Sequence, residues 1–137
     1  MLRLAFVLTR DQQQAEDVVQ EAFLDVQQRW TALLNPGGYL RTAVVNGCHR
    51  WRQLEGNRSR IVRENVVVLG TRPAPAEDTY IVDVLDRLPE RQRSAVVLAY
   101  YCGLGARDIA ETLDCRPGTA KSLVHRGLRR LRKELEE

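Results

Sequence analysis

The sequence predicts an all-α protein made of two small helical domains joined by a flexible linker. Apolar residues recur at steps of three and four through most of the 137 residues, which is the period of one face of an α-helix. The last third has the pattern of two helices separated by a tight turn. One short apolar run, 66–69, has no neighbouring strand to pair with, so it gives no support for a sheet. We place the first domain at 1–63, the linker at 64–79 and the second domain at 80–137.

The first domain is predicted to contain two long helices. Asp11 stands where it can cap the first of them, and the sequence Asn-Pro-Gly-Gly at 35–38 breaks the chain. A second helix is expected from Tyr39 into an arginine-rich stretch. The apolar positions that define the buried face of the first helix are Ala15, Val18, Val19, Ala22, Phe23 and Val26.

The helical period is lost between 64 and 79, where Gly70, Pro73 and Pro75 occur. We therefore expect a linker there. Helical spacing returns near Tyr80, and Leu-Pro-Glu at 88–90 is expected to restart a helix. The apolar positions of the two helices around this restart are Ile81, Val84, Leu85 and Leu88, then Val96, Val97, Leu98, Tyr100 and Tyr101.

The end of the chain is predicted to form a helix-turn-helix with a basic second helix. Asp114 to Gly118 is a tight break, and Pro117 is suited to the first position of the helix that follows. From Arg116 to Lys133 the chain holds seven Arg or Lys and no acid. A helix with one packed face and a basic remainder fits the major groove of DNA. Its packed face is expected to consist of Ala120, Val124, Leu128, Leu131 and Leu135.

Composition places the chain among ordinary globular proteins. It is 44% apolar and 28% charged, and no apolar run approaches the ~18 residues of a membrane-spanning helix, so we expect a cytoplasmic protein. The net charge of +3 says little, but the charged residues are unevenly distributed along the chain. Residues 11–25 include five acids and no base, and residues 41–63 include six Arg and one Glu. Such blocks suggest an acidic partner face and basic faces for polyanions. Ordinary solvated helix surfaces are the alternative.

The residues that would indicate an enzyme or a metal site are missing from the sequence. The three cysteines, Cys48, Cys102 and Cys115, show no CxxC spacing, and only two histidines could join them as ligands. There is no glycine-rich phosphate loop, no GxSxG and no HExxH. We expect no metal, no cofactor and no catalytic activity.

Two blocks of sequence resemble a known family. AEDVVQEAFLDVQQRW (15–30) is followed by YLRTAVVN (39–46), and LPERQRSAVVLAYYCGLGARDIAETLDCRPGTAKSLVHRGLRRLRKEL occupies 88–135. In this order and separation they resemble bacterial sigma factors of the extracytoplasmic-function (ECF) group. The resemblance implies a two-domain factor that binds RNA polymerase core and directs it to promoters, with an anti-sigma factor as a second partner. Members usually carry about one more helix before the point where this chain begins.

The resemblance assigns roles to three groups of residues. The first helix would dock on the clamp coiled coil of the β′ subunit, the next segment would recognise and open the −10 element, and the last helix would read the −35 element beside the β flap. Departures occur at Arg50, Gln53 and Leu123, where the family often has Asp, Arg and Arg. The implied polymerase contacts are Asp17, Gln20, Glu21 and Asp25; those to the −10 strand are Tyr39, Arg41, Asn46, Arg50, Trp51 and Arg52; those to the −35 duplex are Arg116, Thr119, Lys121, Ser122, His125 and Arg126.

Two other interpretations stay open from the sequence. A stand-alone helix-turn-helix regulator would account for residues 105–135 but leaves the AEDVVQEAF block without a role. A sigma-like adaptor that binds polymerase or an anti-sigma factor without opening promoters would account for the short N-terminus and for the altered Arg50, Gln53 and Leu123.

Overall fold

The computed structural model describes residues 1–62 and 76–136, with the backbone alone for 56–62 and 76–79. The part of the chain that it describes is helical, without a strand, and confirms the all-α class. The chain divides into two compact units, Met1–Ala74 and Pro75–Glu137. The helices are α1 (Leu2–Thr9), α2 (Gln12–Gln28), the short 3-10 helix η1 (Trp30–Ala32), α3 (Pro36–Val62), α4 (Ala76–Asp86), α5 (Glu90–Tyr100), α6 (Ala106–Leu113) and α7 (Pro117–Glu136).

The predicted linker falls mostly outside the described residues. Positions 64–75 are not described, but α4 begins at Ala76, ahead of the start that we predicted at Tyr80.

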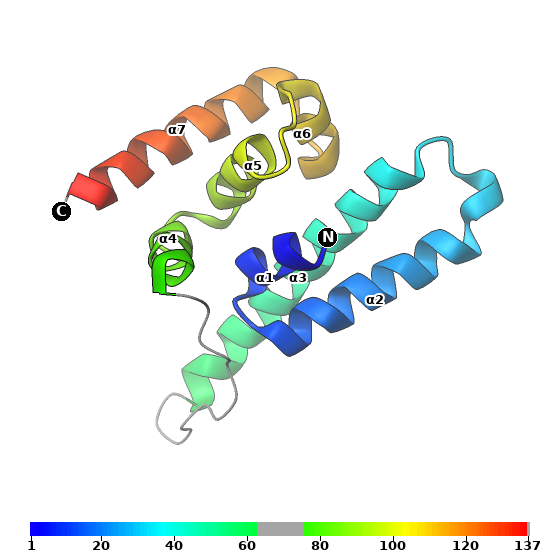
Figure 1. The fold of residues 1–137 in the computed structure, drawn as a ribbon, viewed down its shortest axis with the longest axis horizontal. Coiled ribbons are helices and arrows are strands. Elements are labelled where there is room, and N and C mark those ends of the chain that lie inside the picture. The colour runs from blue at the N-terminus through cyan, green and yellow to red at the C-terminus, as the bar shows by residue number, and fades with distance from the viewer. Residues whose placement is uncertain (63–75, 137) are drawn as a thin grey trace. The chain divides into compact units, whose positions relative to one another are not determined.

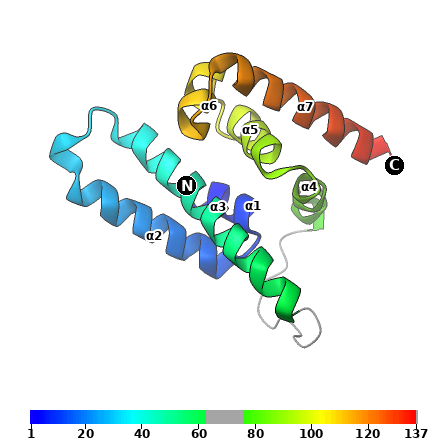
Figure 2. The same cartoon turned by 180° about the vertical axis from the view of Figure 1, so that it is seen from behind.

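In the first unit α1 packs on both α2 and α3, and these two long helices run side by side in opposite directions (Figures 1 and 2). The predicted cap is present: Asp11 Oδ1 accepts a hydrogen bond of 3.1 Å from the backbone N–H of Gln14. The helices close on a core of small and branched side chains: Leu4, Ala5, Leu8, Ala15, Val18, Ala22, Val26, Val44, Val45 and Cys48.

The turn into α3 differs from the prediction. The helix begins at Pro36, three residues ahead of Tyr39, because proline is well suited to a first helical position and Asn35 supplies the cap. The Oδ1 of Asn35 accepts from the N–H of Gly38 at 3.1 Å. The two glycines therefore lie inside the first turn of α3, where we had expected a break.

Close packing in this unit depends on small groups of α3. A Cβ on Gly47 would lie 2.8 Å from Val18 Cγ1, so α2 and α3 can approach this closely only with glycine there. The next residue, Cys48, is fully buried, with its Sγ 3.8 Å from the carbonyl oxygen of Ala5. Burial raises the pKa of the Cys48 thiol to about 12.

In the second unit α5 and α6 pack against α7, and α4 contacts α7 as well. Arg93 is buried at 6% exposure. Its Nε donates to the carbonyl of Leu85 at 3.1 Å and its Nη2 to that of Leu88 at 2.8 Å. These carbonyls lie at the end of α4 and in the turn after it, so one buried guanidinium holds the α4–α5 turn and satisfies acceptors that the helix leaves open.

The helix-turn-helix is formed by α6 and α7. Asp114 takes the left-handed conformation (φ 53°) after the last residue of α6, and Arg91 of α5 donates from Nη2 to the carbonyl of Leu113 at 2.9 Å. Further along α7, Gly127 is buried against α5: a Cβ there would lie 2.5 Å from Val96 Cγ2 and 3.1 Å from the carbonyl oxygen of Gln92. The position of α7 on α5 is thus set by a glycine.

Several residues that the periodicity assigned to the core are exposed. Among them are Phe23 (52% exposed) and Tyr100 (68%). Both sit at the edge of an apolar stripe, where a helical repeat cannot distinguish the rim of a packed face from its centre. The other exposed members of the predicted core are Ile81, Tyr101 and Leu135.

Candidate functional site

The exposed face of α7 carries the residues that the sequence assigned to duplex recognition. Ala120 and Gly127 are buried against the rest of the unit. The six predicted residues lie at or just before the first three turns of the helix, and their side chains are exposed: Arg116, Thr119, Lys121, Ser122, His125 and Arg126. This is the arrangement in which the early residues of a recognition helix can reach base edges.

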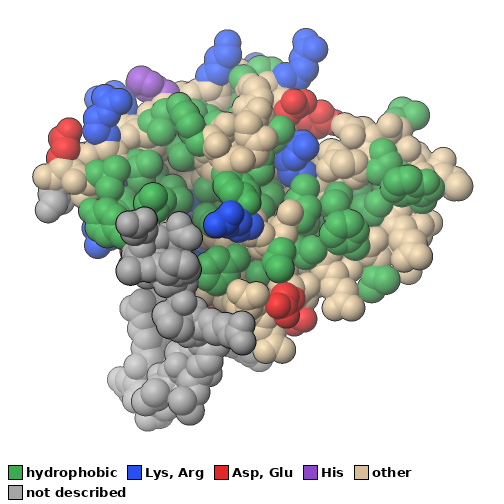
Figure 3. Space-filling model, in the orientation of Figure 1, with side chains coloured by type: hydrophobic (Ala, Val, Ile, Leu, Met, Phe, Trp, Pro, Cys, Tyr) green, Lys and Arg blue, Asp and Glu red, His purple; other side chains and the backbone are tan. Residues whose placement is uncertain are grey.

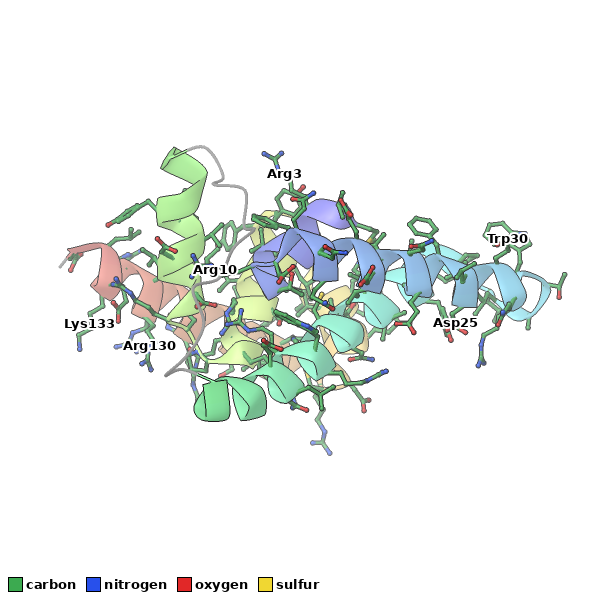
Figure 4. The ribbon with its side chains drawn as sticks, turned by 90° about the horizontal axis from the view of Figure 1, so that it is seen from below. Arg3, Arg10, Asp25, Trp30, Arg130 and Lys133 are labelled. Atoms are coloured by element: carbon green, nitrogen blue, oxygen red, sulfur yellow. The ribbon has the colours of Figure 1, made fainter. Side chains whose placement is uncertain are left out.

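Positive charge continues along α7 beyond these residues. The helix carries six Lys or Arg, and its only acids are the two glutamates at its end. Figure 3 shows basic side chains along the outer edge over α7. Figure 4 shows Arg130 and Lys133 projecting from the same side of the helix. Such a row attracts a polyanion without regard to sequence.

The exposed face of α2 is polar and partly acidic. Asp17, Gln20 and Glu21 are exposed, while Val18 and Ala22 beside them are buried against the other helices of the unit. Hydrogen bonding between the three polar side chains and basic groups of a partner would leave the core of the unit undisturbed.

Asp25 and Tyr39, which the sequence assigned to two different surfaces, bond to each other. The Tyr39 hydroxyl donates to Asp25 Oδ2 at 2.6 Å, and Arg29 Nε donates to Asp25 Oδ1 at 2.9 Å. The hydrogen bond from Tyr39, followed by that from Arg29, lowers the pKa of the Asp25 carboxyl, and the same bond raises the pKa of Tyr39. This cluster ties the end of α2 to the start of α3, so both residues have an intramolecular role that the sequence assignment missed. Figure 4 shows Trp30 projecting from this end of the unit, away from Asp25.

The predicted strand-binding residues of α3 fall into two groups. Asn46 and Arg50 are exposed one turn apart, whereas Arg41 and Trp51 are half-buried. Arg52 is engaged with the fold: its Nη1 donates to the carbonyl of Leu8 at 2.9 Å. Leu8 lies in the last turn of α1, so Arg52 caps that helix. The sequence had assigned Arg52 to strand binding only, and it missed this contact within the fold.

No group of three His, Cys, Asp or Glu side chains among the described residues is arranged to hold a metal ion. Within the same ranges, none of the helices has the length and apolar character needed to cross a bilayer.

Sequence reasoning missed two residues that position the recognition helix. Gly127 sets how closely α7 approaches α5, and its only signal in the sequence is a glycine at a helical position where the periodicity predicts a buried side chain. Arg91 holds the carbonyl at the end of α6, and no spacing rule indicates that contact.

The fold and these surfaces define a helix-turn-helix DNA-binding protein with an additional helical unit that carries a polar face. The family pattern described as "Sigma-70, region 4" matches residues 78–131. The RNA polymerase sigma-E factor of Streptomyces avermitilis is 32% identical over 142 residues, covering 99% of this chain and 79% of the relative. The ECF RNA polymerase sigma factor SigL of Mycobacterium tuberculosis is 30% identical, covering 98% of this chain and 82% of the relative.

A solved structure is similar across both units. The sigma factor RpoE from Bartonella quintana, crystallised in complex with the anti-sigma factor NepR, superposes with a TM-score of 0.77 at 25% identity, covering 98% of this chain and 89% of that one. The chain belongs to the ECF group of the sigma-70 family. It binds RNA polymerase core and directs it to promoters. The stand-alone regulator is not favoured, because the relatives align with the first unit as well as the second.

Proposed function

We propose that the two units divide promoter recognition between them: the second reads the −35 duplex and the first docks on polymerase and captures the −10 strand. The observation that carries this division is the separation of exposed surfaces. The residues assigned to each role lie on different helices, and those on α7 and α2 leave the packed core intact. The proposal treats the chain as a factor without catalytic activity or cofactor that acts beside polymerase in the cytoplasm.

For polymerase docking the proposed contacts are Asp17, Gln20 and Glu21 on α2. They are exposed, and an amide between two carboxylates suits hydrogen bonding to basic side chains. Asp25 joins this set through its position near the end of α2, while its bonds to Tyr39 and Arg29 fix the turn that follows.

For the −10 element the proposed contacts are on α3. Asn46 can read a base edge, Arg50 can hold the strand backbone, and Trp51 with Arg41 lies beside them half-buried. An opened strand needs attraction for its phosphates and stacking or amide contacts for its bases. Tyr39 and Arg52 are proposed to act by positioning this helix.

For the −35 element all six exposed residues of the α7 face are proposed contacts. Arg and Lys can bond guanine in the major groove, and the hydroxyl and imidazole groups supply contacts to bases or phosphates. The contact expected to show this most directly is Lys121, which is exposed on the second turn of α7.

An anti-sigma factor is the second proposed partner. The similar structure from Bartonella quintana is of a sigma factor in complex with one. A protein that covers the polar face of α2 or the basic face of α7 would block polymerase or promoter binding directly.

The division of roles is tested by measuring binding of the full chain to core polymerase and to promoter duplex separately. Asp17→Ala with Gln20→Ala should weaken core binding and leave duplex binding unchanged, and Lys121→Ala should do the reverse. The matched control is Glu111→Ala, which removes an exposed acid of α6 and should leave core binding unchanged. Equal loss of core binding in the control and the α2 variant would reject the docking assignment.

A further inference from the structure

A basic groove lies between α7 and the start of α5. It has a volume of about 630 Å³, and four of the six side chains that line it are cationic. Gly127 lets α7 approach α5 closely beside it, because a Cβ at 127 would lie 3.1 Å from the carbonyl oxygen of Gln92. The lining residues are Gln92, Arg126, Arg129, Arg130, Lys133 and Glu134.

The positive charge of this groove is not neutralised by the side chains that the structure describes in this unit. Its one acid, Glu134, is bonded through Oε2 to Nη1 of Arg87 at 3.1 Å. The four cations are exposed, and none of them has a carboxylate partner among the residues that the structure describes. Like charges on adjacent helical turns repel one another, so a bound anion would stabilise this arrangement.

Gln92 offers a polar group at the same place. Its Oε1 is buried and has no hydrogen-bond partner within the described part of the chain. A terminal amide carries two N–H donors as well as this acceptor.

We propose that this groove holds the phosphate backbone of duplex DNA next to the bases read by the first turns of α7. The proposal rests on the proposed −35 function and deepens it. Ser122, Arg126 and Arg130 follow at steps of four and Lys133 at a further three, so they share one face of the helix. At 1.5 Å rise per residue, the seven steps from Arg126 to Lys133 extend the contact by about 10 Å. Duplex DNA carries one charge per ~1.7 Å of axis, so several phosphates lie within this span.

The continuity of this row with the reading residues favours DNA over an acidic polypeptide as the occupant. The groove residues would then set affinity and register without selecting sequence, since phosphate contacts carry no direct base information. Arg126 lines the groove and also belongs to the predicted reading face, so it can contact either a phosphate or a base.

The test measures the salt dependence of duplex binding by the full chain, using fluorescence anisotropy and a duplex selected from a random pool by the wild-type chain. Arg130→Ala and Lys133→Ala should each lower the slope of log K against log salt by about 0.9, the value for one phosphate contact. The matched control is Arg132→Ala: Arg132 is an exposed arginine of α7 that does not line the groove, and its loss should lower the slope clearly less than either groove substitution.

Each other outcome overturns the proposal in a distinguishable way. An equal loss of slope in all three variants means that the charge acts diffusely and the groove is not a site. A slope that falls with Lys121→Ala but not with the groove variants means that DNA is read by α7 without reaching the groove, and the proposed function stands. If Arg130→Ala weakens binding of poly-glutamate while the DNA slope is unchanged, the occupant is an acidic polypeptide. Failure of the wild-type chain to select any duplex contradicts the proposed function together with the groove.

Discussion

The substitution Gly127→Ala tests how the recognition helix is positioned. In an open helix this change would stabilise the protein by about 1 kcal/mol, because alanine has the higher helix propensity. Here the added Cβ would lie 2.5 Å from Val96 Cγ2 and 3.1 Å from the carbonyl oxygen of Gln92. Val96 is buried and, being β-branched, is restricted to one rotamer in a helix. The helices must therefore move apart.

The expected magnitude follows from the two opposing effects. Overpacking a well-packed core costs about 1–3 kcal/mol, and we expect the upper end because one of the contacts is backbone. After subtracting the gain in propensity, Gly127→Ala should lower the free energy of unfolding of the second unit by about 2 kcal/mol. The control is Gly118→Ala on the first turn of α7, because a Cβ there would meet nothing within 4 Å. This substitution should leave the free energy of unfolding unchanged or raise it.

The assay is urea unfolding of the full chain followed by two signals. Both tryptophans, Trp30 and Trp51, lie in the first unit, so tryptophan fluorescence reports that unit, whereas circular dichroism reports both. Gly127→Ala should shift the dichroism transition to lower urea and leave the fluorescence transition in place. A variant as stable as Gly118→Ala would refute the claim that this glycine sets the helix position.

Three further predictions concern other contacts. Arg91→Ala removes the hydrogen bond to the carbonyl of Leu113, so it should lower the stability of the second unit by about 1.5–3 kcal/mol and weaken duplex binding without changing its salt slope. Arg52→Ala should lower the fluorescence-detected stability of the first unit by a similar amount, because Arg52 caps α1, whereas the exposed Arg50→Ala should not; equal effects would contradict this assignment. The pKa of Cys48 rises from 9.0 to about 12 on folding, so its thiol favours the folded state below pH 9.0. This contribution should fall by up to ~1.4 kcal/mol per pH unit between about 9 and 12, and Cys48→Ala should flatten that decline in the urea midpoint of the first unit.

The sequence was sufficient to predict the fold class and the helix-turn-helix. Both depend on local signals: a repeat of three and four residues, a capping Asp11, and a proline at the start of α7. These signals act within one helix or one turn, so they can be recognised without knowledge of the partner helices.

The missed features depend on contacts between segments far apart in sequence. Arg52 was expected on a DNA-binding face because arginine suits phosphate, but its guanidinium reaches a carbonyl of α1. Asp25 and Tyr39 meet only because the connection at 29–35 folds α3 back along α2. Phe23 is exposed because the packed face of α2 is narrower than its apolar pattern. Such contacts are fixed by tertiary packing, which a helical period does not encode.

The most direct test of the central claim is transcription in vitro with purified core polymerase from Streptomyces coelicolor, whose sigma-E factor is 33% identical to this chain. The template would be a pool of random DNA fragments, and the 5′ ends of the transcripts would be sequenced. If the chain directs polymerase to promoters, transcripts that depend on it should share two sequence elements at a fixed spacing upstream of their starts. Lys121→Ala should reduce their yield. Binding to core polymerase without any chain-dependent start would contradict the account and identify the protein as an adaptor that does not open promoters.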